Sequence, residues 1–150
     1  MSLKEQLTED MKAAMKAKAE GKQRLAVIRM VRSAIKQQEI DGQKELDDEG
    51  VIAVISKEVK MRRDSLEEFK KGNRDDLVAA TQAEIDVLMA YLPQQLTEEE
   101  LRPIVAEAVK EAGAESPRDM GKVMKVLMPK VKGRADGKLV NNLVREILNA

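Results

Sequence analysis

The sequence contains no cysteine, histidine or tryptophan, and only one tyrosine and one phenylalanine among its 150 residues. Without cysteine there is no disulfide framework, thiolate metal site or cysteine nucleophile, and without histidine there is no imidazole ligand or base. These absences exclude zinc enzymes with such ligands and histidine-based catalytic triads. The scarcity of aromatic side chains also argues against recognition of single-stranded nucleic acid by base stacking.

The residues that are present favour helices. Hydrophobic residues make up 43% of the chain and are almost all aliphatic or methionine, while 36% of the residues are charged. A mixture rich in Ala, Leu, Glu, Lys and Arg has high helix propensity. A chain of this length buries roughly two-thirds of the surface that its unfolded form exposes, which is enough for a substantial core. The composition therefore predicts an all-α protein.

A four-helix N-terminal part is predicted over residues 1–95, from four stripes of apolar residues at helical spacing. Ser2 and Glu5 form a capping box that begins the first helix. The fourth helix is expected to end at Pro93, because the residue before a proline is pushed out of helical geometry. The other helix ends are expected near Gly21, Asp41-Gly42, Asp47 to Glu49 and Lys70 to Gly72. The residues expected to be buried are Leu3, Leu7, Met11, Met15, Leu25, Ile28, Val31, Ile35, Ile52, Ile55, Val59, Leu66, Phe69, Leu77, Ile85, Leu88 and Leu92.

A small three-helix C-terminal part is predicted over residues 96–150. Thr97 and Glu100 form a capping box for its first helix, and Pro103 is expected to bend that helix or delay its start, because proline lacks a backbone N–H. The remaining helix ends are expected at Gly113, Ser116-Pro117, Pro129 to Gly133 and Asp136. The expected apolar faces comprise Leu101, Ile104, Val105, Ala108, Val109, Leu139, Val140, Leu143, Val144, Ile147 and Leu148.

Charge is unevenly distributed, although 27 basic and 27 acidic residues give a formal net charge of zero. Residues 118–138 contain seven basic and two acidic residues, whereas residues 96–115 contain two basic and six acidic residues. Clustered cations are natural partners of phosphate groups, so the C-terminal basic segment is a candidate RNA-binding surface. Its candidate cations are Lys122, Lys125, Lys130, Lys132, Arg134 and Lys138. An ordinary solvated surface is the alternative, and it stays open.

A second basic stretch lies at residues 12–36, where eight basic residues stand against Glu20 alone. Helical spacing places Arg29, Arg32 and Lys36 in one stripe on the second predicted helix. For this stripe the favoured interpretation is a solvated helix face.

The glycines at Gly133 and Gly137, followed by Lys138, superficially resemble a phosphate-binding loop. That motif requires four residues between the glycines and a hydroxyl residue after the lysine, whereas this chain has three residues and Leu139. A weaker alternative is a phosphate at the start of the last helix. The favoured interpretation is a turn in which Asp136 caps that helix.

Two other patterns also lack required parts. Oxygen-bearing side chains alternate as in a calcium loop at Asp41, Gln43, Glu45 and Asp47, but Leu46 and Ile52 stand where that loop needs Gly and Glu. The preferred interpretation is an acidic connecting loop. Ser56 and Lys60 are one helical turn apart, and the preferred interpretation is an exposed helix face, since no oxyanion hole or pocket is indicated. No catalytic residue, metal ligand or cofactor site is predicted.

Three motifs resemble those of a known family. They are Tyr91-Leu-Pro-Gln-Gln-Leu-Thr-Glu-Glu-Glu-Leu101, Asp119-Met-Gly-Lys-Val-Met124 and Lys132-Gly-Arg-Ala-Asp-Gly-Lys-Leu-Val-Asn141. Together they are similar to the YqeY-like proteins, whose fold is also that of the tail region of the B subunit of the tRNA-dependent amidotransferase. The resemblance spans the chain and implies an all-helical N-terminal part followed by a three-helix part.

In the amidotransferase, this tail region contacts tRNA outside the acceptor end, while phosphorylation and amide transfer take place in other domains and in a partner subunit. The resemblance therefore implies a tRNA contact without catalytic groups. By matching positions, the residues that would inherit this contact are Gly121, Lys122, Lys125, Lys132, Gly133, Lys138 and Asn141. Family descriptions that mention a carbon–nitrogen ligase with glutamine as amide donor would therefore describe the whole amidotransferase complex, from which the fold is known.

The leading hypothesis is a helical module that associates with tRNA, or with a complex containing it, through the basic C-terminal segment. One alternative is a protein-interaction adaptor that uses the acidic 96–115 and basic 118–138 segments. Another is a carbon–nitrogen ligase function exercised as part of a complex. Glu5, Glu9 and Asp10 occupy the stretch where a signal peptide would be apolar, and no apolar run approaches membrane-spanning length. These features predict a cytoplasmic protein without membrane association.

Overall fold

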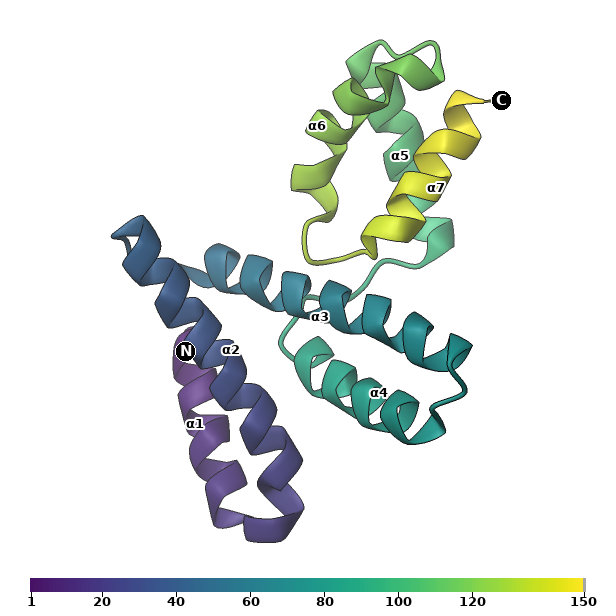
Figure 1. The fold of residues 1–150 in the computed structure, drawn as a ribbon. Coiled ribbons are helices and arrows are strands. Elements are labelled where there is room, and N and C mark those ends of the chain that lie inside the picture. The colour runs from purple at the N-terminus through teal and green to yellow at the C-terminus, as the bar shows by residue number, and fades with distance from the viewer. Residues whose placement is uncertain (150) are drawn as a thin grey trace. The chain divides into compact units, whose positions relative to one another are not determined.

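The computed structural model describes residues 1–149, and this range contains seven α-helices, two short 3₁₀ helices and no strand (Figure 1). The chain divides into two compact units, Met1–Leu92 and a second that begins at Pro93. The first unit contains α1 (Leu3–Lys16), α2 (Lys22–Gly42), α3 (Asp48–Lys71) and α4 (Asp75–Met89), with a 3₁₀ helix at Lys18–Gly21. The second contains α5 (Glu98–Ala112), α6 (Met120–Val131) and α7 (Gly137–Leu148), with a 3₁₀ helix at Pro117–Asp119. The predicted all-α class, with four helices followed by three, is confirmed; the domain boundary at residues 95 and 96 stays a prediction.

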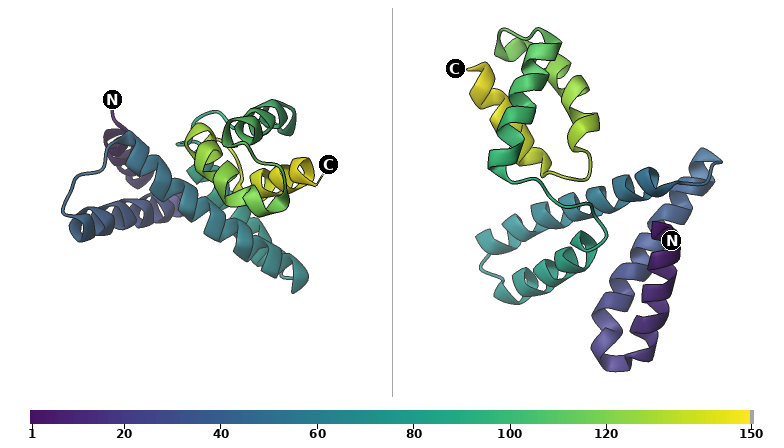
Figure 2. Two further views of the ribbon diagram at one scale, coloured as in Figure 1. Left: turned by 90° about the horizontal axis from the view of Figure 1, so that it is seen from above. Right: turned by 180° about the vertical axis from the view of Figure 1, so that it is seen from behind.

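In the first unit, α1 and α2 form an antiparallel hairpin (Figures 1 and 2). The predicted capping box at Ser2 and Glu5 is present at the start of α1. The hairpin turns at Gly21, where a Cβ atom would lie 2.2 Å from the carbonyl oxygen of Ala14, so only glycine allows this close approach. The expectation that Met15 is buried is wrong, because it is 49% exposed, and the neighbouring Ala14 is buried instead.

The long α3 packs against α4, and Arg62 is buried between helices. Its guanidinium group donates to the carboxylate of Glu58 at 2.8 Å and to that of Glu84, on α4, at 3.2 Å. It also donates to the sulfur of Met30, on α2, at 3.3 Å. The buried positive charge is therefore balanced by two carboxylates and connects three helices.

Ser56, on α3, does not lie on an exposed face as predicted. Its hydroxyl oxygen is buried and has no hydrogen-bond partner among the described residues, while Lys60 is exposed. The reason is that the buried stripe of α3 includes Val51 and Val54 beside Ile55, which shifts it toward Ser56. Ser56 and Lys60 therefore do not share an environment.

Tyr91 anchors the segment that follows α4 to the α1–α2 hairpin. Its hydroxyl group donates to Oδ2 of Asp10 at 2.5 Å, and Arg24 on α2 lies 3.5 Å from the same oxygen. Burial of the phenol, together with its hydrogen bond to the Asp10 carboxylate, raises the pKa of Tyr91 to about 12. The Tyr91 hydroxyl therefore stays protonated and acts as a donor to Asp10 at neutral pH.

In the second unit, α5 packs against both α6 and α7 around a separate core that includes Leu101, Val105, Leu127 and Leu143. The predicted capping box at Thr97 and Glu100 begins α5 at Glu98.

The predictions at the two prolines have different outcomes. Pro103 does not delay α5, which begins at Glu98, and a bend at Pro103 stays a prediction. The helix α6 ends at Val131, between Pro129 and Gly133 as expected. Both prolines are exposed, so solvent can hydrate the carbonyl group that each leaves without an intrahelical donor.

Candidate nucleic-acid interface

The exposed face of α6 carries part of the predicted site. This face includes Gly121, Lys122 and Lys125, which are all exposed. The buried face of the same helix is formed by Val123, Leu127 and Val131. A Cβ atom at Gly121 would meet no heavy atom within 4 Å. Packing therefore does not require glycine at this position, although glycine costs helix stability there.

The loop after α6 is held by the segment that precedes α5. Gly133 has a positive φ of 75°, and its carbonyl oxygen accepts a hydrogen bond from the side chain of Gln95 at 2.7 Å. The backbone N–H of Leu96 donates to the carbonyl of Arg134 at 2.7 Å. Nε of Arg134 donates to the carbonyl of Gln94 at 3.5 Å. The first and third sequence motifs thus meet here, and Gly133 and Arg134 have a structural role in joining them.

The first turn of α7 is capped by Asp136, whose carboxylate accepts a hydrogen bond from the backbone N–H of Lys138 at 3.1 Å. This is the turn-and-cap arrangement that the sequence favoured. The side chain of Lys138 is exposed, and Asn141 is half-buried one turn later.

Arg145 was not among the predicted site residues, yet it belongs to the same exposed stripe of α7 as Lys138. It is exposed and seven residues after Lys138, a spacing that returns to one face of a helix. Among residues 1–149 its side chain has no acidic partner within ion-pair distance. Helical periodicity, extended beyond the dense basic run, would have found it.

Two of the predicted cations are partly neutralised within the chain. Lys130 turns toward α5 and forms an ion pair with Glu111 at 2.9 Å. Lys122 lies 3.8 Å from Asp119, although 72% of its side chain is exposed. The backbone N–H of Glu115 is the main cause that lowers the pKa of Asp119, and the charge of Lys122 adds to it. Asp119 therefore stays ionised and reduces the local positive charge.

Lys125 and Lys132 are exposed, and within the described part of the chain neither forms an ion pair. Ten residues of sequence separate Lys122 from Lys132, which corresponds to about 15 Å along a helix axis. The exposed basic residues are thus spread over α6, the loop after it and α7, and this set is called the basic row below. Cations spread in this way suit a polyanion better than a single small anion.

Other kinds of site receive no support from the described residues. Over residues 1–149, no group of three or more Asp and Glu side chains is arranged to hold a metal ion. None of the helices in this range has both the length and the apolar character needed to span a bilayer.

Comparison with known proteins decides the family. The family model described as Yqey-like protein matches residues 4–148, nearly the whole chain. The chain belongs to the YqeY-like family. This confirms the resemblance of the three sequence motifs.

Curated relatives of this YqeY-like chain include fungal proteins named "Altered inheritance of mitochondria protein 41, mitochondrial". The protein from Pyrenophora tritici-repentis is 33% identical over 147 residues, which cover 96% of this chain and 80% of the relative. Those from Lachancea thermotolerans and Saccharomyces cerevisiae are 44% and 41% identical over 89 and 93 residues. These two matches cover 59% and 61% of this chain, and 46% and 49% of the relatives.

The names of these relatives contradict the predicted cytoplasmic location, since all three are named as mitochondrial proteins. The prediction was based on the lack of a long apolar segment. That property is common to proteins of every aqueous compartment, so it does not distinguish one compartment from another.

Proposed function

We propose that the C-terminal unit of this YqeY-like protein binds tRNA, or an RNA assembly that contains it, through the basic row of α6 and α7. The row is defined as Lys122, Lys125, Lys132, Lys138 and Arg145. The observation that carries the proposal is that Lys125, Lys132 and Arg145 are exposed and have no ion-pair partner among residues 1–149. Exposed cations without internal partners are available to release counterions from a nucleic-acid backbone.

The choice of tRNA is supported by the resemblance to the amidotransferase tail region, which contacts tRNA outside its acceptor end. The choice of a folded RNA is supported by the composition. Tyr91 and Phe69 are the only aromatic residues of the sequence and both lie in the first unit, so no aromatic side chain of the C-terminal unit can stack on an unpaired base. Recognition would then depend on the RNA backbone and shape.

Gly121 also supports this assignment. It is exposed on the same helix face as Lys125, and packing does not require a glycine there. A missing side chain on a binding surface lets an external phosphate approach the backbone closely. Gly133 and Arg134, in contrast, are proposed to shape the loop that presents Lys132.

The proposal is tested by measuring tRNA affinity as a function of salt, with fluorescence anisotropy of labelled tRNA. The four lysines of the row contribute about −3 to the slope of log affinity against log salt, which is a loss of about 60-fold between 50 and 200 mM salt. A variant with Lys122, Lys125, Lys132 and Lys138 changed to Gln is expected to bind weakly, with a slope that is shallower by about 3.

The matched control changes four exposed lysines of the first unit to Gln, and it should retain both affinity and slope. Its positions are Lys44, Lys57, Lys60 and Lys70. Equal losses in the two variants would show a non-specific charge effect and contradict the proposal. A protein partner that survives nuclease treatment, and that is lost only from the C-terminal variant, would instead indicate an adaptor surface.

A further inference from the structure

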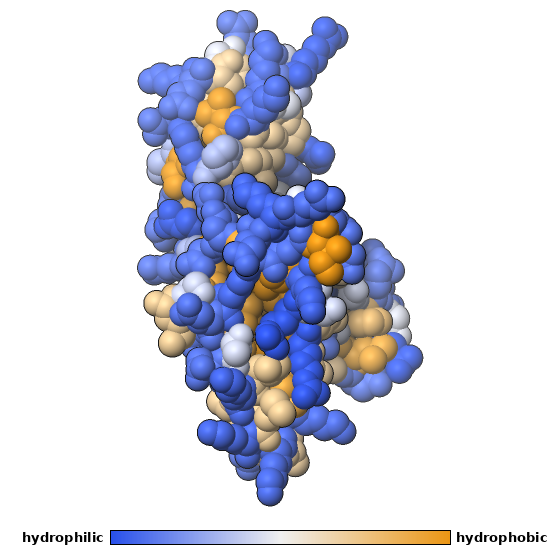
Figure 3. All heavy atoms as spheres, turned by 90° about the vertical axis from the view of Figure 1, so that its left-hand side faces the viewer, coloured by the Kyte–Doolittle hydropathy of each residue, from blue (hydrophilic) through white to orange (hydrophobic). Residues whose placement is uncertain are grey.

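The first unit contains a groove between α1 and α2 that is independent of the C-terminal basic row. It has a volume of about 610 Å³, within the range typical of small-molecule sites. Lys4, Leu7, Thr8, Met11, Arg29, Arg32, Ser33, Ile35, Lys36 and Glu39 line it. Figure 3 views the side of the molecule on which this hairpin lies, and hydrophobic atoms are visible there between long hydrophilic side chains.

The charges around the groove do not balance. Its lining contains four cations and one carboxylate, which leaves an excess of three positive charges. Glu39 is paired with Lys4 and also accepts a hydrogen bond from the backbone N–H of Leu46 at 2.7 Å. The hydrogen bond from Lys4 is the main cause that lowers the pKa of Glu39, so this carboxylate remains ionised and paired with Lys4.

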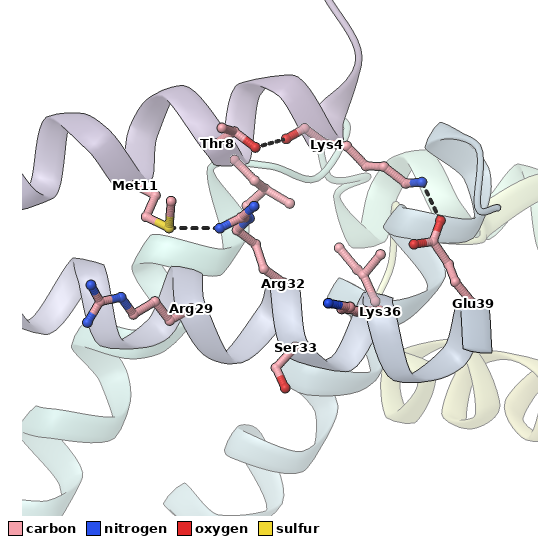
Figure 4. A pocket seen from close by; sticks show the side chains of 10 residues that line it. Lys4, Thr8, Met11, Arg29, Arg32, Ser33, Lys36 and Glu39 are labelled. Atoms are coloured by element: carbon pink, nitrogen blue, oxygen red, sulfur yellow. Dashed lines mark hydrogen bonds and ion pairs between the residues drawn. The ribbon is translucent and has the colours of Figure 1, made fainter. Parts of the chain in front are cut away.

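The three remaining cations all come from α2 and lack an acidic partner within the described residues. Arg32 reaches across to α1, where it donates to the sulfur of Met11 at 2.8 Å, and a thioether is a weak acceptor (Figure 4). Arg29 and Lys36 have no ion pair among residues 1–149. The sequence predicted that Arg29, Arg32 and Lys36 form a solvated helix face. In the structure this exposed face also borders a groove, which the sequence did not predict.

The base of the groove is apolar. Leu7 and Ile35 are buried side chains of the first core, and Met11 is half-buried beside them. The hydroxyl group of Thr8 donates to the carbonyl of Lys4 at 3.0 Å, so the hydroxyl oxygen can still accept a hydrogen bond from a ligand. Ser33 is exposed on α2 and borders the groove, although its hydroxyl group points away from α1 (Figure 4). Cations at the rim and aliphatic side chains at the base fit a ligand with both an anionic and an apolar part.

We propose that this groove binds a small phosphate monoester that carries an apolar group. A guanidinium group matches the geometry of phosphate oxygens, which accept paired hydrogen bonds, and Arg32 places one across the groove. A phosphate monoester carries nearly two negative charges at neutral pH and so offsets more of the uncompensated charge than a carboxylate does. Its apolar group would lie against Leu7, Met11 and Ile35.

The test uses 1-naphthyl phosphate as the probe, titrated into the full chain by calorimetry, with 1-naphthoate as a carboxylate of similar shape. The phosphate is expected to bind more tightly than the carboxylate. Arg32→Gln is expected to weaken binding of the phosphate at least tenfold, since it removes a charge-assisted hydrogen bond. The control Lys22→Gln removes the same charge from the same helix outside the groove and should change the affinity less than twofold.

Amide chemical shifts of the unmodified protein give a second measurement that does not depend on variants. Naphthyl phosphate should shift the amides of Thr8, Met11 and Ser33 and leave those of α6 and α7 unchanged. Equal affinity for phosphate and carboxylate, equal effects of Arg32→Gln and Lys22→Gln, or shifts confined to the C-terminal unit would each overturn the proposal. It would also be overturned if Arg32→Gln reduced only tRNA binding, because the groove would then belong to an RNA surface.

Discussion

The hydrogen bond between Tyr91 and Asp10 provides a quantitative test of the first unit. In the variant Tyr91→Phe the phenyl ring can still fill its buried site, but the donor to Asp10 at 2.5 Å is lost. A hydrogen bond to a charged group contributes about 1.5–3 kcal/mol. Arg24 lies 3.5 Å from the same oxygen and still balances the charge of Asp10 in the variant, so the loss should not exceed this range. We therefore expect a loss of about 2 kcal/mol in the free energy of unfolding at pH 7.

The pH dependence of this loss follows from the raised pKa of Tyr91. The pKa is about 12 in the folded protein against an ordinary value of 10.0. A group whose pKa is raised by folding contributes its full stabilisation below its unfolded pKa and loses it as the pH rises through its folded pKa. The difference between wild type and Tyr91→Phe should thus be constant up to about pH 9 and shrink between pH 10 and 12.

The assay is urea denaturation followed by far-ultraviolet circular dichroism, with wild type, Tyr91→Phe, Asp10→Asn and the double variant. Because the chain has two compact units, the transition of each must be fitted separately. The double-mutant cycle should give a coupling energy of about 1–2 kcal/mol between the two side chains. A change below about 0.5 kcal/mol in Tyr91→Phe, or additive effects of the two variants, would refute the reasoning.

Three further predictions concern stability. Ser56→Ala should raise the unfolding free energy by about 1 kcal/mol in urea denaturation, because it removes a buried hydroxyl without a partner; a loss would mean that the hydroxyl is satisfied. Gly21→Ala should lower the melting temperature of the first unit, whereas Gly121→Ala should leave that of the second unchanged or raised, and equal effects would contradict the described packing. Arg62→Gln should cost about 2–3 kcal/mol, since Glu58 loses its buried counterion while Glu84, with 37% of its side chain exposed, stays partly hydrated; a neutral result in the same assay would rule out this role.

The sequence predicted features that depend on local interactions. Both capping boxes, at Ser2 and at Thr97, lie where the hydroxyl and glutamate spacing placed them. Asp136 caps α7 because an aspartate can accept a bond from the nearby backbone without help from the rest of the fold. The helical class and the order of the helices follow from the same kind of signal.

Features that depend on distant residues were not predictable in this way. The contact of Gln95 with Gly133 joins residues that are far apart in the sequence, as does that of Tyr91 with Asp10. The burial of Ser56 depends on how α3 packs against its neighbours, which a single helical stripe does not specify. For the candidate RNA site, the sequence located the basic segment but not the pairing of Lys130 with Glu111, which only the packing of α6 on α5 reveals.

The most direct test of the proposed RNA site is an amide chemical-shift titration of the intact chain with tRNA, followed residue by residue. Binding through the basic row predicts the largest shifts at Gly121, Lys125 and Lys132 and in the first turn of α7, with little change in α1 to α4. Shifts that are absent at a tRNA concentration that saturates binding, or that concentrate in the first unit, would contradict the proposal.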